Sequence, residues 1–323
     1  MKISKKIVSI LTATALVASL TGCGSNGSSS KKYTIGICQL MEHEALDAAT
    51  KGFKDTLTKK LGKDNVEFDE QNAQGESTNC STICNGFVTS NVDLILANAT
   101  AALQAAAAGT SEIPILGTSI TDYATALDID NWTGTTGLNI SGTSDLAPID
   151  QQEAILKEII PNAKKVGILY CSSEPNSAYQ SKLMQEALKK DGIAYKEYTA
   201  ADSNEIQSVT TTACDECDVL YVPTDNTMAS SVNTIKNVAI PAGIPMIAGE
   251  KGICAAGVAT LSIDYYNLGC QTGEMAYDIL KNKKKAGDME VQFAKKLTKM
   301  YNAENAKALN ITIPDGYEPI ESK

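Results

Sequence analysis

The chain has 323 residues, 43% of them hydrophobic, which is enough for two modest domains with buried cores. Its formal charge is −10, and this acidic balance predicts a protein that avoids nucleic acid and anionic lipid headgroups. All 28 positive charges are lysines, so hydroxyls, backbone N–H groups, helix N-termini or a lysine must hold any bound carboxylate in place of a guanidinium fork.

The N-terminus predicts a targeting segment. Three lysines precede an interrupted apolar run, 7–20, which is too short for a comfortable membrane span. Small residues then lead into Cys23, as in the lipobox of bacterial lipoproteins, and this resemblance implies cleavage before Cys23 and its lipidation. The alternative is an ordinary secretory signal. We expect a signal peptide at 1–22 and a flexible Gly/Ser-rich tether at 23–32; losing three lysines and no acid would change the charge from −10 to −13.

The next part of the chain alternates short apolar runs with amphipathic segments. The expected strands are 33–40, 65–71, 92–97 and 113–117, and the expected helices are 45–61, 76–90 and 99–109. Continuous apolar strands joined by helices predict a parallel sheet that is covered on both faces. The polar, Gly/Thr-rich stretch 131–145 is interpreted as the first crossing to a second lobe.

The same rhythm then repeats. The expected strands are 166–171, 194–199, 219–222, 245–248 and 257–263, and the expected helices are 147–160, 177–190, 203–214, 228–239 and 265–281. Two similar halves predict an α/β fold with two doubly wound parallel-sheet lobes joined by a hinge, rather than one barrel. The last helix and the tail after 284 would make the later crossings. We expect a first lobe of 33–141 plus 264–285 and a second lobe of 142–263 plus 286–323.

Eight cysteines follow Cys23. Cys38 and Cys171 lie in apolar runs, where small core residues are common. In an exported protein the eight could form disulfides. The spacings of the pairs at 80/84 and 214/217 would suit a metal or a redox dithiol, but one lone CxxC is a weak signal. Because His43 is the single histidine, mixed Cys/His zinc sites are nearly excluded. We expect mostly free structural thiols, no metal and no cofactor.

Several motifs together resemble a known family. They are Gln39 to Asp47 (QLMEHEALD), 72–75 (NAQG), 116–122 (LGTSITD), 141–145 (SGTSD), 221–227 (YVPTDNT) and 302–314. The chain resembles ABC substrate-binding lipoproteins with the type I periplasmic-binding-protein fold, in the branch that includes tryptophan- and tyrosine-binding members. Glu44 is a departure, because the family usually places proline before the first helix.

The resemblance implies a function as well as a fold. It implies capture of a small solute by closure of two lobes, docking on an ABC transporter permease, and a lipid-anchored position on the extracellular face of the cell membrane. An amino acid-like ligand is expected, and the resemblance favours tryptophan, tyrosine or phenylalanine. Another amino acid, another small polar solute, or a receptor role in a sensory system are the alternatives.

Candidate ligand-binding residues follow from the rule that parallel sheets bind ligands at the carboxyl ends of their strands. In the first lobe these ends carry hydroxyls and amides, which suit a carboxylate, and in the second they carry acids, which suit an ammonium. Each could instead be a plain helix cap. We assign Thr118 and Ser119 to a ligand carboxylate and Asp225 to its ammonium. The full candidate set is Gln39, His43, Asn98, Thr100, Thr118, Ser119, Asp122, Ser173, Asn176, Thr224, Asp225, Asn226, Glu250 and Asp264.

Two further points concern side chains and chemistry. Trp132 would line the cleft or pack at the hinge, and His43 would contact the ligand or cap the next helix. Doubly wound lobes also build enzymes, but the turn after the first strand contains no glycine, and the sequence has neither a GxSxG nor a GxxxxGK[ST] motif. We therefore expect a binding protein with no catalytic residue.

Overall fold

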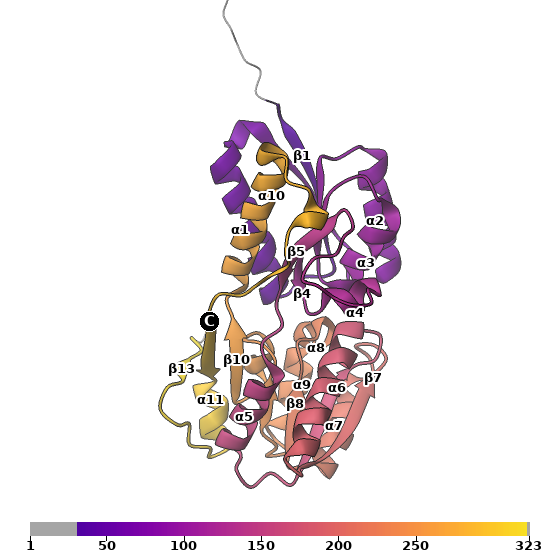
Figure 1. Cartoon of the computed structure of the whole chain (residues 1–323). Coiled ribbons are helices and arrows are strands. Elements are labelled where there is room, and N and C mark those ends of the chain that lie inside the picture. Colours follow the sequence, from indigo (N-terminus) through magenta and orange to yellow (C-terminus); the bar gives the residue numbers. More distant parts are fainter. Residues whose placement is uncertain (1–30, 322–323) are drawn as a thin grey trace, which may run out of the picture. The chain divides into compact units, whose positions relative to one another are not determined.

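The structure of the protein is a computed structural model that describes residues 31–321. The expected signal peptide, Cys23 and most of the expected tether lie outside the described residues. Within 31–321, none of the helices combines the length and apolar character that crossing a bilayer requires. The described residues contain two mainly parallel sheets flanked by helices, so the predicted α/β fold with two parallel-sheet lobes is confirmed (Figure 1).

The first sheet has the strand order β11-β5-β4-β3-β1-β2. Its strands are β1 (Tyr33–Gln39), β2 (Val66–Asn72), β3 (Leu94–Asn98), β4 (Ile115–Ile120), β5 (Ile140–Ser144) and β11 (Gln292–Phe293). Its helices are α1 (Glu44–Leu61), α2 (Ser77–Thr89), α3 (Thr100–Gly109), α4 (Tyr123–Leu127) and α10 (Tyr265–Asn282), with short turns η1 (Lys63–Asn65) and η3 (Ala286–Asp288). The central strands are mainly apolar because one core packs against α2 and α3 and another against α1 and α10.

The second sheet has the order β13-β12-β10-β9-β8-β6-β7, and β12 runs antiparallel to β10. Its strands are β6 (Lys165–Cys171), β7 (Ala194–Ala200), β8 (Val219–Val222), β9 (Met246–Ala248), β10 (Ala259–Ile263), β12 (Leu297–Tyr301) and β13 (Glu318–Pro319). Its helices are α5 (Ile149–Ile159), α6 (Pro175–Lys190), α7 (Ile206–Glu216), α8 (Asn226–Ser230), α9 (Val232–Ala239) and α11 (Ala303–Ala308), with the short turn η2 (Ile253–Ala255). The single helix expected at 228–239 is thus two helices that meet at Ser231.

The first crossing differs from the expectation. The stretch 131–145 includes β5, whose polar sequence ISGTS concealed a buried strand. Its hydroxyls find partners inside the lobe: Ser141 Oγ donates to the Met289 carbonyl at 2.8 Å, and Thr143 Oγ1 lies 2.8 Å from Thr272 Oγ1 on α10. The expected lobe boundary at 141 therefore falls inside β5, and β11, which we placed in the second lobe, pairs with β5.

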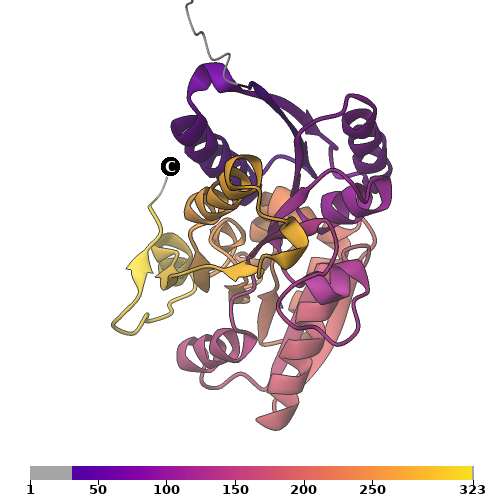
Figure 2. The ribbon, with the colours of Figure 1, turned by 45° about the horizontal axis from the view of Figure 1, so that its top comes forward.

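Helices α1 and α10 lie side by side although they are far apart in the sequence (Figures 1 and 2). Glycines allow their backbones to touch. A Cβ atom on Gly269 would lie 1.9 Å from the Ala49 carbonyl oxygen, and one on Gly52 would lie 2.0 Å from the Tyr266 carbonyl oxygen. This contact attaches α10, which directly follows β10 of the second sheet, to the first lobe.

The eight cysteines of the described residues are all free thiols. Seven are buried, and Cys270 on α10 is partly exposed. Cys38 and Cys171 occupy strand positions in the cores, where they act as small apolar side chains.

Candidate ligand-binding site

A pocket lies where the carboxyl ends of strands from the two sheets meet. It is built from the start of α1 and the end of β5 in the first lobe, and from the ends of β8, β9 and β10 in the second. Its volume is about 10 Å³, roughly the room of one water molecule. A ligand as large as an amino acid can therefore enter only when the lobes separate. The lining residues are His43, Ala45, Leu46, Asp145, Thr224, Asp225, Asn226, Ala229, Glu250 and Tyr265.

Two direct contacts join the lobes at this pocket: one between His43 and Asn226, and one between Glu44 and Lys251. His43 Nε2 of the first lobe lies 3.1 Å from Asn226 Oδ1 of the second. Within the second lobe, Asn226 Nδ2 donates to Glu174 at 2.7 Å. Because the amide nitrogen of Asn226 is used in this way, its oxygen accepts and His43 donates. Burial lowers the pKa of His43, so the ring is neutral near pH 7. Next to it, Lys251 Nζ of the second lobe binds Glu44, the first residue of α1, at 2.9 Å.

Three buried carboxyl groups dominate the chemistry of the pocket. Asp145, Asp225 and Glu250 are 4%, 1% and 4% exposed, respectively. The residues lining the pocket include no lysine. A carboxylate buried without a cationic partner is unfavourable, and an ammonium group supplied by a ligand would relieve that cost. The pocket is therefore chemically suited to a cationic group.

Asp145 follows β5 and is held by side chains. It accepts hydrogen bonds from Thr121 Oγ1 at 3.2 Å and from the Tyr265 hydroxyl at 2.9 Å. Burial raises the pKa of Asp145 to about 6, and the two hydrogen bonds partly oppose that rise. Because Tyr265 begins α10, directly after β10, its bond to Asp145 also connects two of the segments that cross between the lobes.

Asp225 and Glu250 are held by backbone N–H groups. Asp225 accepts from Cys171 N at 2.7 Å and from Met228 N at 2.8 Å, and Glu250 accepts from the two amides at 252 and 253, each at 2.6 Å. Burial raises the pKa of Glu250 to about 7, and burial together with the charge of Glu174 raises the pKa of Asp225. Each carboxylate still has acceptor sites for a ligand, because it offers about four.

Glu250 should make stability depend on pH. Its folded-state pKa of about 7 lies above the usual 4.5, so its contribution is fully present below about pH 4.5 and is lost as the pH rises through 7. In Glu250→Gln this loss is absent. We expect the free energy of unfolding of the variant, relative to the parent, to rise by up to about 3 kcal/mol between pH 4.5 and 7.5. Urea denaturation at the two pH values measures this change.

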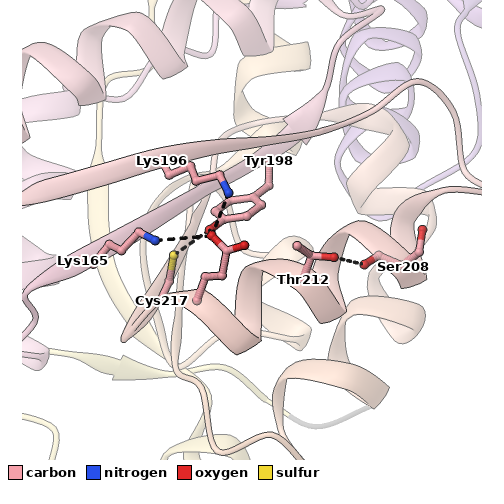
Figure 3. A network of polar contacts seen from close by, with 7 residues as sticks. Lys165, Lys196, Tyr198, Ser208, Thr212 and Cys217 are labelled. Carbon is pink, nitrogen blue, oxygen red and sulfur yellow. Dashed lines mark hydrogen bonds and ion pairs between the residues drawn. The ribbon is translucent and has the colours of Figure 1, made fainter.

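Glu216 supplies the matched control for that experiment. It lies at the end of α7 in a surface network and accepts hydrogen bonds from Lys196 at 2.7 Å and from the Tyr198 hydroxyl at 2.8 Å. Figure 3 shows Lys165, Lys196 and Tyr198 of this network close together. Its bond to Lys196 lowers its pKa to about 2, so it is ionised in both the folded and unfolded chain above about pH 4.5. Glu216→Gln should change stability equally at pH 4.5 and 7.5. A pH-independent effect of Glu250→Gln would contradict the raised pKa.

The carboxyl ends of two first-lobe strands, which do not line the pocket, have strained backbone and unpaired polar atoms. Ala99 follows β3 and has a φ angle of 88°, and Ser119, near the end of β4, has a φ angle of 56°. Both angles lie in the left-handed region that favours glycine. Within residues 31–321, the Ser119 hydroxyl is buried without a hydrogen-bond partner, as is Asn98 Oδ1. Strain and unpaired groups of this kind concentrate at ligand-binding sites. Ser119 does not line the pocket, but its unpaired hydroxyl makes it a better carboxylate candidate than Thr118 at this edge of the sheet.

Other predicted first-lobe residues are bonded inside their own lobe. Thr118 Oγ1 lies 3.2 Å from Thr143 Oγ1 in the interior of the sheet. Gln39 Nε2 donates to Asp47 at 2.7 Å, and Asn98 Nδ2 donates to the Leu46 carbonyl at 2.8 Å. These amides fix the start of α1 beside the pocket. Thr100 is buried at the first position of α3, and none of these residues lines the pocket.

The remaining predicted residues act as caps or lie elsewhere. Asp122 caps α4 by accepting from Thr125 N at 2.7 Å, and Asp264 caps α10 by accepting from Asn267 N at 3.0 Å. Asn176 donates to Glu174 at 3.1 Å and so supports the acid that holds Asn226. Ser173 is exposed, and its hydroxyl bonds to the Ala201 carbonyl at 3.4 Å. Trp132 stacks on Tyr123, with ring centroids 6.5 Å apart, and does not line the pocket.

The structure thus brings His43, Thr224, Asp225, Asn226 and Glu250 together, as the strand-end rule predicted. The sequence analysis missed Asp145 and Tyr265. Asp145 was assigned to a crossing because β5 was not identified as a strand; with β5 identified, the same rule would have selected it. Tyr265 follows β10, where the same rule applies, but it was not included among the candidates.

A second cavity of about 750 Å³ adjoins the pocket along α1, α10, β10 and β12. Its lining includes Glu44, Lys251, Lys296 and Glu318. Here opposite charges pair with one another, at 2.9 Å for Glu44 with Lys251 and 4.0 Å for Lys296 with Glu318. We assign the ligand to the smaller pocket, because three buried acids meet there and no lysine lines it.

Comparison with known proteins gives a consistent family. The family described as ABC transporter substrate binding protein matches residues 34–317. A tyrosine-binding protein of Clostridioides difficile is 38% identical over 323 residues, which cover 95% of this chain and 93% of the relative. A Streptococcus pneumoniae domain crystallised with L-Trp superposes with a TM-score of 0.85 at 30% identity, covering 90% of this chain and all of the other.

A solved structure from Clostridium difficile is of a ligand-free, open form. The protein is CD0873, a substrate-binding protein with adhesive properties, at 36% identity and with a TM-score of 0.69, covering 90% of this chain and 100% of the other. The motifs of the strand ends, the two-lobed fold and these matches agree. The chain belongs to the family of ABC transporter substrate-binding proteins, with the type I periplasmic-binding-protein fold of the tryptophan- and tyrosine-binding branch.

Proposed function

We propose that this substrate-binding protein captures an aromatic amino acid, tryptophan, tyrosine or phenylalanine, between its two lobes. The observation that carries the proposal is the group of three buried acids in a pocket lined by no lysine. The ligand ammonium would bind Asp145, Asp225 and Glu250, and its carboxylate would bind the strand ends around Ser119. The names of the C. difficile and S. pneumoniae relatives support the aromatic class.

The pocket opens and closes by hinge motion in this proposal. The chain superposes better on the L-Trp complex, at 30% identity, than on the ligand-free, open CD0873, at 36% identity. Higher identity with a lower TM-score supports a difference in lobe arrangement. The ligand would favour closure because it contacts both lobes only in the closed form.

Thermal-shift measurements on the chain from residue 23 onward test the ligand class. A true ligand at 100 times its dissociation constant should add about 2.7 kcal/mol to the free energy of unfolding. We expect this gain with at least one of tryptophan, tyrosine and phenylalanine. If all three leave the melting temperature unchanged and another solute raises it, the aromatic assignment is wrong; turnover of any added solute would contradict the binding role.

We also propose that Cys23 carries a lipid anchor on the extracellular face of the membrane and that the closed form delivers ligand to an ABC permease. The lipobox-like sequence before Cys23 and the family support both points. Labelled fatty acid should appear on the full-length chain in its host and be lost in Cys23→Ala. Persistence of the label in Cys23→Ala would contradict anchoring at this cysteine.

The ion pair between Lys251 and Glu44 should slow ligand release. It joins the lobes at 2.9 Å beside the pocket, but both side chains are about 40% exposed, so it is weak. We expect Lys251→Gln to raise the ligand dissociation rate by about two- to fivefold, corresponding to at most about 1 kcal/mol. Stopped-flow fluorescence measures the rate. Lys182→Gln, an exposed lysine on α6, is the control and should leave the rate unchanged.

A further inference from the structure

One end of the first lobe is basic, although the chain as a whole is acidic. Three segments form it: 32–33 at the start of β1, 59–67 at the end of α1, and 278–288 at the end of α10. They contain eight lysines and four acids, a formal charge of +4, against −10 for the whole chain. All eight lysines are exposed. We call this set the basic end: Lys32, Lys59, Lys60, Lys63, Lys281, Lys283, Lys284 and Lys285.

Contacts between the segments show that they form one surface. The Tyr33 hydroxyl donates to the Leu280 carbonyl at 3.1 Å, and Lys281 Nζ lies 5.4 Å from the centre of the Tyr33 ring. Lys32 pairs with Glu67 at 2.6 Å. The start of β1 and the C-terminal ends of α1 and α10 lie together in Figure 1. Since ligands bind at the carboxyl ends of the strands, this surface lies at the opposite edge of the sheet from the pocket.

Much of the positive charge is not neutralised locally. The four acids of these segments are Asp64, Glu67, Asp278 and Asp288. Lys60 pairs with Glu274, and Lys284 pairs with Asp278 at 2.6 Å. Within the described part of the chain, five lysines of the basic end form no ion pair: Lys59, Lys63, Lys281, Lys283 and Lys285. Of these, Lys283 Nζ donates to the Leu280 carbonyl at 3.1 Å.

We propose that the basic end binds the anionic phospholipid headgroups of the membrane to which the chain is tethered. This rests on the proposed anchor at Cys23. Eight residue steps separate Cys23 from Lys31, so the covalent chain can span at most about 29 Å between them. That length keeps the basic end close to the bilayer, where each lysine gains roughly 1 kcal/mol from an anionic surface. The ligand pocket, at the other edge of the sheet, is then held away from the lipid.

The acidic total predicts that the chain avoids anionic lipid, and the basic end is the local exception. At physiological ionic strength charges are screened beyond about 8 Å. A membrane in contact with this end is therefore attracted by its lysines and is screened from most of the acids farther along the molecule. The interaction should weaken with added salt.

Vesicle binding by a chain that lacks the lipid anchor tests this proposal. Residues 32–323 form a compact unit by themselves, so the chain from residue 23 with Cys23→Ser can be mixed with vesicles of phosphatidylcholine, alone or with phosphatidylglycerol. Sedimentation then measures binding at low and physiological salt. We expect binding only to the mixed vesicles. The variant K59Q/K63Q/K281Q/K285Q should bind about 600-fold more weakly, at about fivefold per lysine.

A matched variant keeps the total charge equal. K182Q/K189Q/K190Q/K307Q removes four exposed lysines from the second lobe and should retain binding. Equal loss in both variants, or equal binding to both kinds of vesicle, would overturn the proposal. The thermal shift with ligand is measured on the same samples. A normal ligand response without vesicle binding would contradict only the proposal that the basic end binds lipid. Vesicle binding without any ligand response would contradict the proposed capture of an aromatic amino acid.

Discussion

Replacing Asp145 by asparagine is expected to weaken amino acid binding about a hundredfold or more, corresponding to about 3 kcal/mol. Asp145 is buried in the pocket and is held by Thr121 and Tyr265 side chains, both of which can also bond to an amide. The variant removes the charge that would pair with the ligand ammonium, and losing one partner of a buried pair costs about 2–5 kcal/mol. Calorimetric titration with the ligand found by thermal shift measures the change.

The control for Asp145→Asn has the same charge change outside the pocket. Asp150 is exposed in the first turn of α5, and Asp150→Asn should leave affinity within about twofold, because isolated surface charges contribute little. The ligand's own chemistry gives a second control. Asp145→Asn should weaken the amino acid far more than its analogue without the amino group. An equal loss for both would exclude an ammonium contact at Asp145.

A methyl group at Gly269 is expected to destabilise the protein by about 3 kcal/mol. In Gly269→Ala the new Cβ would lie 1.9 Å from the Ala49 carbonyl oxygen, a backbone atom that cannot rotate away. Helices α1 and α10 must then separate, which is overpacking of a buried contact. Urea denaturation measures the free energy of unfolding. Because α10 follows the crossing from β10, the variant should also lower ligand affinity.

Gly86 offers the opposite case on α2. A Cβ atom there meets no other atom of the described residues within 4 Å. Gly86→Ala should therefore stabilise the protein by about 0.5–1 kcal/mol, because alanine loses less backbone entropy in a helix than glycine does. If the two alanine variants have similar stabilities, the close contact between α1 and α10 is not what holds these helices together.

The three acids of the pocket show how the fold and the site depend on each other. Asp225 and Glu250 each cap a turn through two backbone N–H groups, so both would be retained for folding alone. Asp145 instead accepts from two side chains, Thr121 Oγ1 and the Tyr265 hydroxyl. Because an asparagine can accept the same two bonds, its substitution changes the charge of the pocket without removing a helix or turn cap, and we expect the largest functional effect from that residue.

Most of the fold could be predicted from the sequence by itself. Strands such as β1, β3 and β6 are continuous apolar runs, because helices cover both faces of each sheet, and this pattern is visible in the chain. The carboxyl ends of these strands identified His43, Asp225 and Glu250, since parallel strands place their ends at one edge. The resemblance to the family that is visible in the sequence rests on the same strand-end motifs.

Only the tertiary structure decided the rest. The strand β5 is polar in sequence and buried because Thr143 and Ser141 find partners on α10 and in the chain that follows it, 129 and 148 residues away. Asp145 lies in the pocket because it directly follows β5. The bonding of Thr118 inside its lobe and the approach of α1 to α10 likewise depend on atoms distant in the chain. Local periodicity reports which faces are apolar, but it does not contain the partners that polar side chains and glycines meet after folding.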